Sequence, residues 1–149
     1  MEKKGFTLVE VMIVIALIAI LTCIAIPNLL RSRLNANERY ATSNVQTISV
    51  AAQTYWSVKN VLPSTLLQLN AEGLLDGSLG CASQPCIKNG YKYYMGGSGL
   101  RTDFFIYTIP QTSNDGVQSF CAGSDGVTRV SATGETPANQ AACNAWGSL

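Results

Sequence analysis

The sequence has no histidine among its 149 residues, and only 13% of its residues are charged, about half the usual share. Without an imidazole, the chain can form neither a Ser-His-Asp or Cys-His catalytic site nor a histidine-ligated zinc or haem site. Ten Lys and Arg residues against nine Asp and Glu residues leave a net charge of +1, so no overall basic field indicates a nucleic-acid partner. The composition therefore argues against a hydrolase and a histidine-ligated metalloenzyme. No cofactor is expected.

Cysteines are few and unevenly distributed. Four of the five lie in the second half of the chain, which is rich in Gly and Ser: Cys81, Cys86, Cys121 and Cys143. An even set in a short region without histidine favours disulfides, and therefore an oxidising compartment outside the cytoplasm. The fifth, Cys23, lies in an apolar run, where we expect it to be a small buried hydrophobic side chain.

The four clustered cysteines allow three pairings. The spacing favours Cys81–Cys86, because Pro85 stiffens the short turn between them. It also favours Cys121–Cys143, because this bond would hold a tail with few apolar anchors and stabilise the fold by about 3 kcal/mol in the chain-entropy model. The alternative is that Cys81 and Cys86 are a free or strained pair.

The longest apolar run extends from Phe6 to Ile26 and has 21 residues. As an α-helix it would be about 31 Å long, which is close to the hydrocarbon thickness of a bilayer. A secretory signal peptide is the alternative, since Lys3 and Lys4 precede the run. The run is longer than the apolar part of a signal peptide, however, and no A-x-A-like cleavage site follows it. The sequence therefore predicts a transmembrane or assembly helix over 6–27.

A second, amphipathic helix is predicted over 28–60, because apolar residues recur there along one helical face. The stripe consists of Leu34, Ala41, Val45, Ile48, Ala52 and Tyr55. Pro27 lacks a backbone donor and is expected to kink the junction of two nearly continuous helices. A chain of this length cannot enclose such a long helix, so its apolar part needs lipid or other helices around it.

Residues 61–149 are expected to form a globular head with disulfides. A short helical or irregular connector is predicted over 65–75. Alternating apolar residues between turns rich in Gly, Asn and Asp then predict strands over 91–94, 104–109, 117–121 and 127–130. Three or four antiparallel strands packed on the apolar stripe would give an α+β fold. The tail from Ser131 onward is small and polar, and no element is predicted there.

One charged residue, Glu10, lies within the apolar run. A carboxylate in hydrocarbon is costly, so a functional partner is the default hypothesis, and the alternative is that Glu10 lies at the membrane interface near the lysines. The segment Gly5-Phe6-Thr7-Leu8-Val9-Glu10, after a short leader with two lysines, resembles the prepilin signal of type IV pilins and type II secretion pseudopilins. The resemblance is specific over about residues 1–35 and extends in general layout to the whole chain.

The resemblance implies that a membrane-embedded prepilin peptidase removes the leader, residues 1–5, by cutting between Gly5 and Phe6, and methylates the new amino terminus at Phe6. It implies a precursor in the inner membrane, which pilus or secretion machinery assembles by helix bundling into a homo-oligomeric helical filament. During assembly the amine of Phe6 would neutralise the Glu10 carboxylate of a neighbouring subunit. The implied product is an extracellular pilus for attachment and twitching motility, and the subunit is structural and not an enzyme.

Other hypotheses remain open. Within the family, the chain could be a minor pilin or a pseudopilin of a periplasmic pseudopilus. From a different class, it could be an extracytoplasmic binding or enzymatic domain whose helix is only a signal anchor. The head departs from many type IV pilins in having cysteines for two disulfides. It also lacks a clear set of acidic ligands for the calcium site of major pseudopilins, since Asp103, Asp115 and Asp125 are scattered.

The aromatic residues invite two further interpretations, an electron-conducting stack and a binding platform. They are Tyr40, Tyr55 and Trp56 on the predicted helix, and Tyr91, Tyr93 and Tyr94 on the predicted sheet. Aromatic residues at such spacings are more often core or subunit contacts, which is the interpretation we favour. The basic residues of the head form no stripe, so no specific nucleic acid is expected. They are Lys88, Lys92, Arg101 and Arg129.

Overall fold

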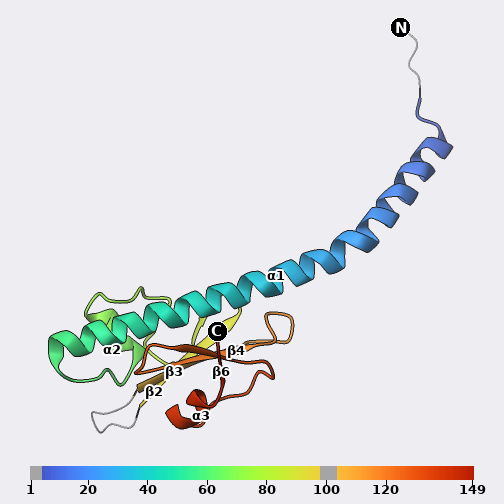
Figure 1. Cartoon of the computed structure of the whole chain (residues 1–149). Coiled ribbons are helices and arrows are strands. Elements are labelled where there is room, and N and C mark those ends of the chain that lie inside the picture. Colours follow the sequence, from blue (N-terminus) through green and yellow to red (C-terminus); the bar gives the residue numbers. More distant parts are fainter. Residues whose placement is uncertain (1–4, 98–103) are drawn as a thin grey trace. The chain divides into compact units, whose positions relative to one another are not determined.

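The computed structural model describes residues 5–97 and 104–149, and the chain divides into two compact units, Met1–Arg33 and Leu34–Leu149. One long helix, α1 (Leu8–Lys59), belongs to both units. In the described part of the first unit, α1 is the only helix or strand. The second unit adds two short helices and a six-stranded antiparallel sheet (Figure 1). The α+β fold predicted from the sequence is confirmed.

Helix α1 begins directly after Thr7, whose side-chain Oγ1 accepts a hydrogen bond of 3.3 Å from the backbone N–H of Glu10. An N-cap residue satisfies a free amide of the first turn in this way. The helix continues through Pro27, so the nearly continuous helix predicted from the sequence is one element of 52 residues. A kink at Pro27 remains a prediction. Asn60, which follows the helix, has a positive φ of 56° and turns the chain out of it.

The sheet is a meander in which each strand pairs with the next, in the order β1-β2-β3-β4-β5-β6. The strands are β1 (Cys86–Lys88), β2 (Tyr91–Gly97), β3 (Phe104–Pro110), β4 (Ser119–Gly123), β5 (Thr128–Ser131) and β6 (Gly147–Ser148). The four predicted strands correspond to β2–β5. The prediction of three or four strands was too low, because β1 and β6 have three and two residues and carry no alternating pattern.

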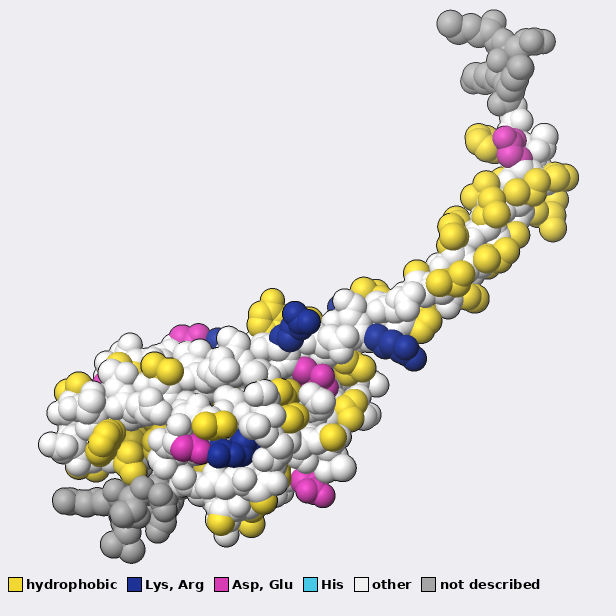
Figure 2. All heavy atoms as spheres, viewed as in Figure 1, with side chains coloured by type: hydrophobic (Ala, Val, Ile, Leu, Met, Phe, Trp, Pro, Cys, Tyr) yellow, Lys and Arg dark blue, Asp and Glu magenta, His cyan; other side chains and the backbone are white. Residues whose placement is uncertain are grey.

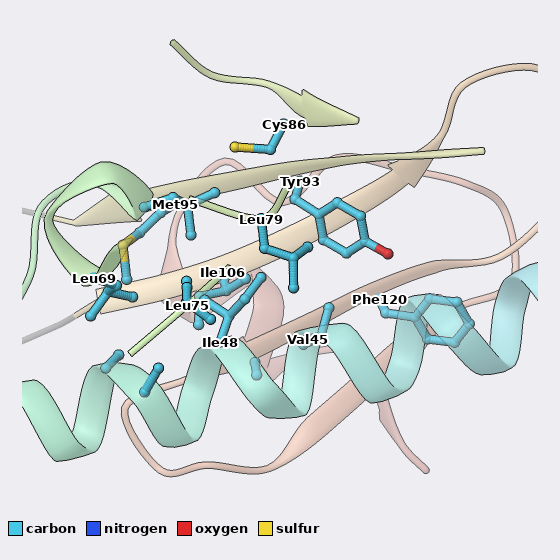
Figure 3. Close-up of a cluster of buried hydrophobic side chains, with 14 of the residues drawn as sticks. Val45, Ile48, Leu69, Leu75, Leu79, Cys86, Tyr93, Met95, Ile106 and Phe120 are labelled. Carbon is cyan, nitrogen blue, oxygen red and sulfur yellow. The ribbon is translucent and has the colours of Figure 1, made fainter. Parts of the chain in front are cut away.

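The core of the second unit lies between α1 and one face of the sheet (Figure 3). Four residues of the predicted stripe, Ala41, Val45, Ile48 and Ala52, are fully buried. The sheet contributes large apolar side chains, namely Tyr91, Tyr93, Met95, Phe104, Ile106 and Phe120. The stripe is wider than predicted, because Ser49 and Ala51 are buried beside it. Alternate residues of β2 and β3 are buried, as expected for a sheet with one face on the core.

Two short helices complete the second unit. Helix α2 (Leu66–Ala71) lies in the predicted connector, and the side chain of Thr65 accepts the backbone N–H of Gln68 at its start. Helix α3 (Gln140–Asn144) lies in the tail where no element was predicted, and Asn139 caps it by accepting the N–H of Ala142. The sequence did not reveal α3, because five residues are too few for a helical period and its contacts with β4 and β3 are tertiary.

The aromatic residues fall into three environments. Tyr91 and Tyr93 are buried in the core, as predicted. Tyr107 stacks on Tyr94 and on Phe105, with ring centroids 4.8 Å and 5.8 Å apart. These three rings lie on the sheet face opposite the core, because their positions alternate with the buried residues of β2 and β3. On α1, Tyr55 packs against the core. Tyr40 and Trp56 are exposed, so they are not core residues. Of the predicted roles, core and subunit contact, only subunit contact applies to them.

Candidate assembly surface

The first unit exposes apolar side chains around its whole circumference. Every residue from Gly5 to Arg33 is exposed, and Ile15, in the middle of the apolar run, is 58% exposed. Figure 2 shows these side chains along the first part of the helix. Helix α1 contains a stretch long and apolar enough to cross a membrane, and none of that stretch is buried. Soluble monomers rarely expose apolar surface on this scale, so the surface requires lipid or other proteins around it.

The peptide bond between Gly5 and Phe6 lies outside the helix. Residues 5–7 have no regular secondary structure, and Phe6 is 83% exposed. A Cβ atom built on Gly5 would meet no heavy atom within 4 Å. The packing of the chain itself therefore does not require glycine at this position, and any requirement for glycine would come from an external partner such as a peptidase.

Glu10 is exposed and occupies the third position of the helix after the N-cap Thr7. This arrangement is the sequence pattern of a capping box, Thr-x-x-Glu. The structure contains the half of the box in which Thr7 accepts the N–H of Glu10. A carboxylate in the first turn also interacts favourably with the helix dipole. Glu10 thus also contributes to the start of the helix, and any test of an assembly role must separate that contribution.

Cys23 lies on the same exposed surface and is the free cysteine of the chain. The expectation that it is buried was wrong for the single chain, because the apolar run has nothing packed against it in this unit. The other four cysteines are joined in the favoured pairing. Cys81 and Cys86 have Cα atoms 5.5 Å apart. Cys121 in β4 and Cys143 in α3 have Cα atoms 6.0 Å apart.

A loop of the second unit is held to α1 by side chains that sequence reasoning missed. Glu38 Oε1 accepts the backbone N–H groups of Val117 and Gln118, at 3.1 Å and 3.3 Å, and Asn37 Nδ2 donates to the carbonyl of Asp115 at 2.9 Å. Tyr91 Oη donates to the carbonyl of Gln118, and burial, with the nearby Glu38 charge, raises the pKa of Tyr91. No sequence pattern marks Asn37 and Glu38, because their partners are about 80 positions away.

In the part of the chain that the structure describes, the acidic residues do not gather into a metal site. Across residues 5–97 and 104–149, no three His, Cys, Asp or Glu side chains lie close enough to hold a metal ion. Asp103, one of the scattered residues considered above, lies outside the described residues. Asp125 pairs with Arg129, whose guanidinium, together with the backbone N–H of Val127, lowers the pKa of the carboxyl group despite partial burial.

Both the N-terminal motif and a longer part of the chain are similar to known proteins. Residues 1–26 match the family model described as the prokaryotic N-terminal methylation motif. The chain is 39% identical over 59 residues to the type IV major pilin protein PilA of Myxococcus xanthus, which is 40% of this chain and 27% of that protein. It is 33% identical over 70 residues to the type II secretion system core protein G of Pectobacterium carotovorum, which is 47% of this chain and 45% of that protein.

The chain covers a larger share of a third relative. The chain is 32% identical over 75 residues to the competence protein ComGC of Halalkalibacterium halodurans, which is 50% of this chain and 74% of that protein. By contrast, the chain spans less than half the length of the PilA and core protein G relatives, and the similarity to all three covers half of this chain at most. No solved structure matches the chain.

Proposed function

Because the chain belongs to the family of type IV pilins and type II secretion pseudopilins, we propose that it is a structural subunit of an extracellular filament. In this proposal the first unit anchors the precursor in the inner membrane and then bundles with the same unit of other copies. The second unit forms the outward-facing head. Surface attachment and twitching motility are the activities that such a filament would serve, and the subunit itself has no catalytic role.

One observation carries this proposal: the apolar stretch of α1 has none of its residues buried within the chain. Burying a large apolar side chain stabilises by about 1.5–3 kcal/mol, so the many large apolar side chains exposed on this stretch provide a large driving force for association. Lipid can cover this surface in the precursor, and identical helices can cover it in a filament. A helix that served only as a signal anchor would need lipid alone.

Processing at Gly5–Phe6 is the step that we propose releases the precursor for assembly. The bond is exposed and lies outside the helix, which suits the extended conformation that a peptidase binds. A prepilin peptidase would remove residues 1–5 and methylate the amino group of Phe6. Removal of the leader also removes Lys3 and Lys4, which would otherwise resist withdrawal of the helix from the membrane.

We further propose that the Glu10 carboxylate pairs with the amino terminus of a neighbouring copy. An unpaired carboxylate in a low-dielectric helix bundle is costly, and a cationic amine in the same layer would offset most of that cost. Glu10 would thereby fix the axial register between two copies.

A pseudopilin of a type II secretion system is the second candidate, favoured by the 33% identity to core protein G. A pseudopilin would use the same processing, the same Glu10 and the same helix bundle, and would differ in forming a periplasmic pseudopilus. A minor pilin would likewise assemble through the first unit. The experiment below therefore tests filament assembly, and the cellular location of the filament separates the candidates.

The test compares Glu10→Gln, Glu10→Ala and the unchanged chain in cells that process it. Glutamine keeps a capping-box side chain at this position but removes the charge, whereas alanine removes both. We expect both variants to insert in the membrane and to be cut after Gly5. Both should form far fewer filaments than the unchanged chain, as counted by electron microscopy of the sheared surface fraction.

Normal filaments from Glu10→Gln together with none from Glu10→Ala would mean that a polar side chain at this position matters and the charge does not, because both variants keep the backbone N–H that donates to Thr7. Normal filaments from both variants would remove Glu10 from the assembly mechanism. Mass spectrometry of the membrane fraction, showing an amino terminus at Phe6, is the control that each variant is processed.

A further inference from the structure

Two arginines follow the apolar run of α1. Arg31 and Arg33 are both exposed, and the sequence has no acidic residue between Glu10 and Glu38. In the described part of the chain the ion pairs are Lys59–Glu72, Lys88–Asp76 and Arg129–Asp125. Neither Arg31 nor Arg33 belongs to one of them, so two uncompensated cations mark the end of the apolar surface.

The guanidinium groups of these two cations can reach back to the depth of the lipid phosphates. If the hydrocarbon ends at Ile26, the Cα atom of Arg31 lies about 7.5 Å beyond the hydrocarbon and that of Arg33 about 10.5 Å beyond it, at 1.5 Å per residue. The headgroup layer of one leaflet occupies about 5–7 Å. Side chains of an α-helix lean toward its N-terminus, so both guanidinium groups lean back toward the membrane.

The two side chains also point to different sides. Positions two apart on an α-helix are separated by about 200°, so Arg31 and Arg33 project from nearly opposite faces. A single neighbouring helix could not reach both, whereas lipid surrounds the helix on all sides. The flanking residues Leu29 and Leu30 are exposed and apolar, which places the cations directly at the boundary of the apolar surface.

Four acidic groups of the second unit are already engaged, which makes them poorer partners for the arginines of another copy. Glu72, Asp76 and Asp125 are paired with cations in the second unit. One carboxylate oxygen of Glu38 is occupied by two backbone amides. Phosphate, in contrast, is the anion that the planar guanidinium group binds in a bidentate manner.

We propose that Arg31 and Arg33 form a binding collar for the headgroups of anionic phospholipids, which fixes the depth of the apolar helix in the membrane before assembly. This inference rests on the proposed membrane-anchored function. After removal of Lys3 and Lys4 with the leader, the collar holds the cationic side chains that flank the helix. Proteolytic processing thus removes the lysines on the leader side of the membrane and leaves the two arginines on the head side.

The test measures the headgroup preference of the lipids that contact the helix. The full chain is reconstituted in phosphatidylcholine vesicles with trace spin-labelled phosphatidylglycerol or spin-labelled phosphatidylcholine, and electron spin resonance gives the motionally restricted fraction of each. A Lys3→Gln/Lys4→Gln background removes the cations of the leader. We compare Arg31→Gln/Arg33→Gln with the charge-conserving Arg31→Lys/Arg33→Lys and with Arg39→Gln, a matched control in the second unit.

The collar predicts that restricted phosphatidylglycerol is preferred over phosphatidylcholine, and that the Gln pair reduces this preference by roughly fivefold for each arginine at low salt. Arg39→Gln leaves the preference unchanged, the Lys pair retains most of it, and high salt weakens it. An unchanged preference in the Gln pair, or no preference in the background chain, overturns the collar while leaving the membrane anchor intact. Absence of any restricted lipid overturns the membrane anchor and the collar together.

Discussion

The two units of this chain use apolar residues in opposite ways. In the first unit, apolar side chains occur on all sides of the helix and all are exposed. In the second unit, the same helix has an apolar stripe, and Ala41, Val45, Ile48 and Ala52 are buried against a sheet. Among the described residues, the apolar side chains of the first unit are left unburied by the chain, whereas those of the stripe in the second unit are buried within it. Helix α1 thus joins a unit with an exposed apolar surface to a unit with a buried apolar core.

The largest expected effect comes from making the same substitution, Ile to Ala, once in each unit. Ile48→Ala removes a fully buried side chain, so we expect the second unit to lose about 2–5 kcal/mol of unfolding free energy. Ile15→Ala removes a side chain that is 58% exposed, and should leave that unfolding free energy unchanged. Denaturant titration in detergent, followed by near-ultraviolet circular dichroism, measures both. Equal losses would contradict the division between the units.

The two disulfides also bear on the difference between the units, since both lie in the second unit. In the chain-entropy model the Cys121–Cys143 bond contributes about 3 kcal/mol and the shorter Cys81–Cys86 loop about 2 kcal/mol. We therefore expect Cys121→Ser/Cys143→Ser to lower the melting temperature more than Cys81→Ser/Cys86→Ser. Peptide mapping without reduction checks the pairing itself. A crosslink between the 81–86 segment and Cys121 or Cys143 would contradict it.

A smaller effect concerns Asp76, in the loop before β1. Its carboxylate accepts hydrogen bonds from Lys88 Nζ, from Ser78 Oγ and from the N–H of Leu79, and these bonds hold the pKa of Asp76 well below its usual range. Because the folded-state pKa is lower than the unfolded-state value, this contribution to stability is present above about pH 4. It is lost as the pH falls through the folded-state pKa.

Comparison of the unchanged chain with Asp76→Asn measures this contribution. The difference in unfolding free energy between them should be largest near neutral pH and should shrink below pH 4, because the wild-type carboxylate becomes protonated. Asp115→Asn serves as a control in a different loop. A difference that stays constant with pH would show that the charge of Asp76 makes no contribution.

An element of this structure could be predicted from the sequence where residues close together in the sequence specify it. The buried stripe of α1 follows a helical period, and β2 and β3 follow an alternating one, so the sequence predicted them. The hairpin joining β1 to β2 also had a local signal, the pair Asn89-Gly90, which adopts the positive φ values of 52° and 76°. That signal was overlooked, and β1 was missed with it.

Other features have no local signal. Strand β6 has two residues and exists through its pairing with Arg129 and Val130. Glu38 fixes a loop about 80 residues away through backbone amides, which any sequence could supply. In the candidate site, the motif around Gly5, Phe6 and Glu10 was found from the sequence, but the structure added that Glu10 belongs to a capping pattern with Thr7.

The most direct test of the central claim, that the first unit is completed by other copies of the chain after processing, is mass spectrometry of the N-terminal peptide from purified surface filaments. The account predicts filaments built of this chain, with an amino terminus at N-methylated Phe6, and no filaments from Gly5→Leu. A chain that stays in the membrane with residues 1–5 attached, or filaments from Gly5→Leu that begin at Phe6, would contradict it.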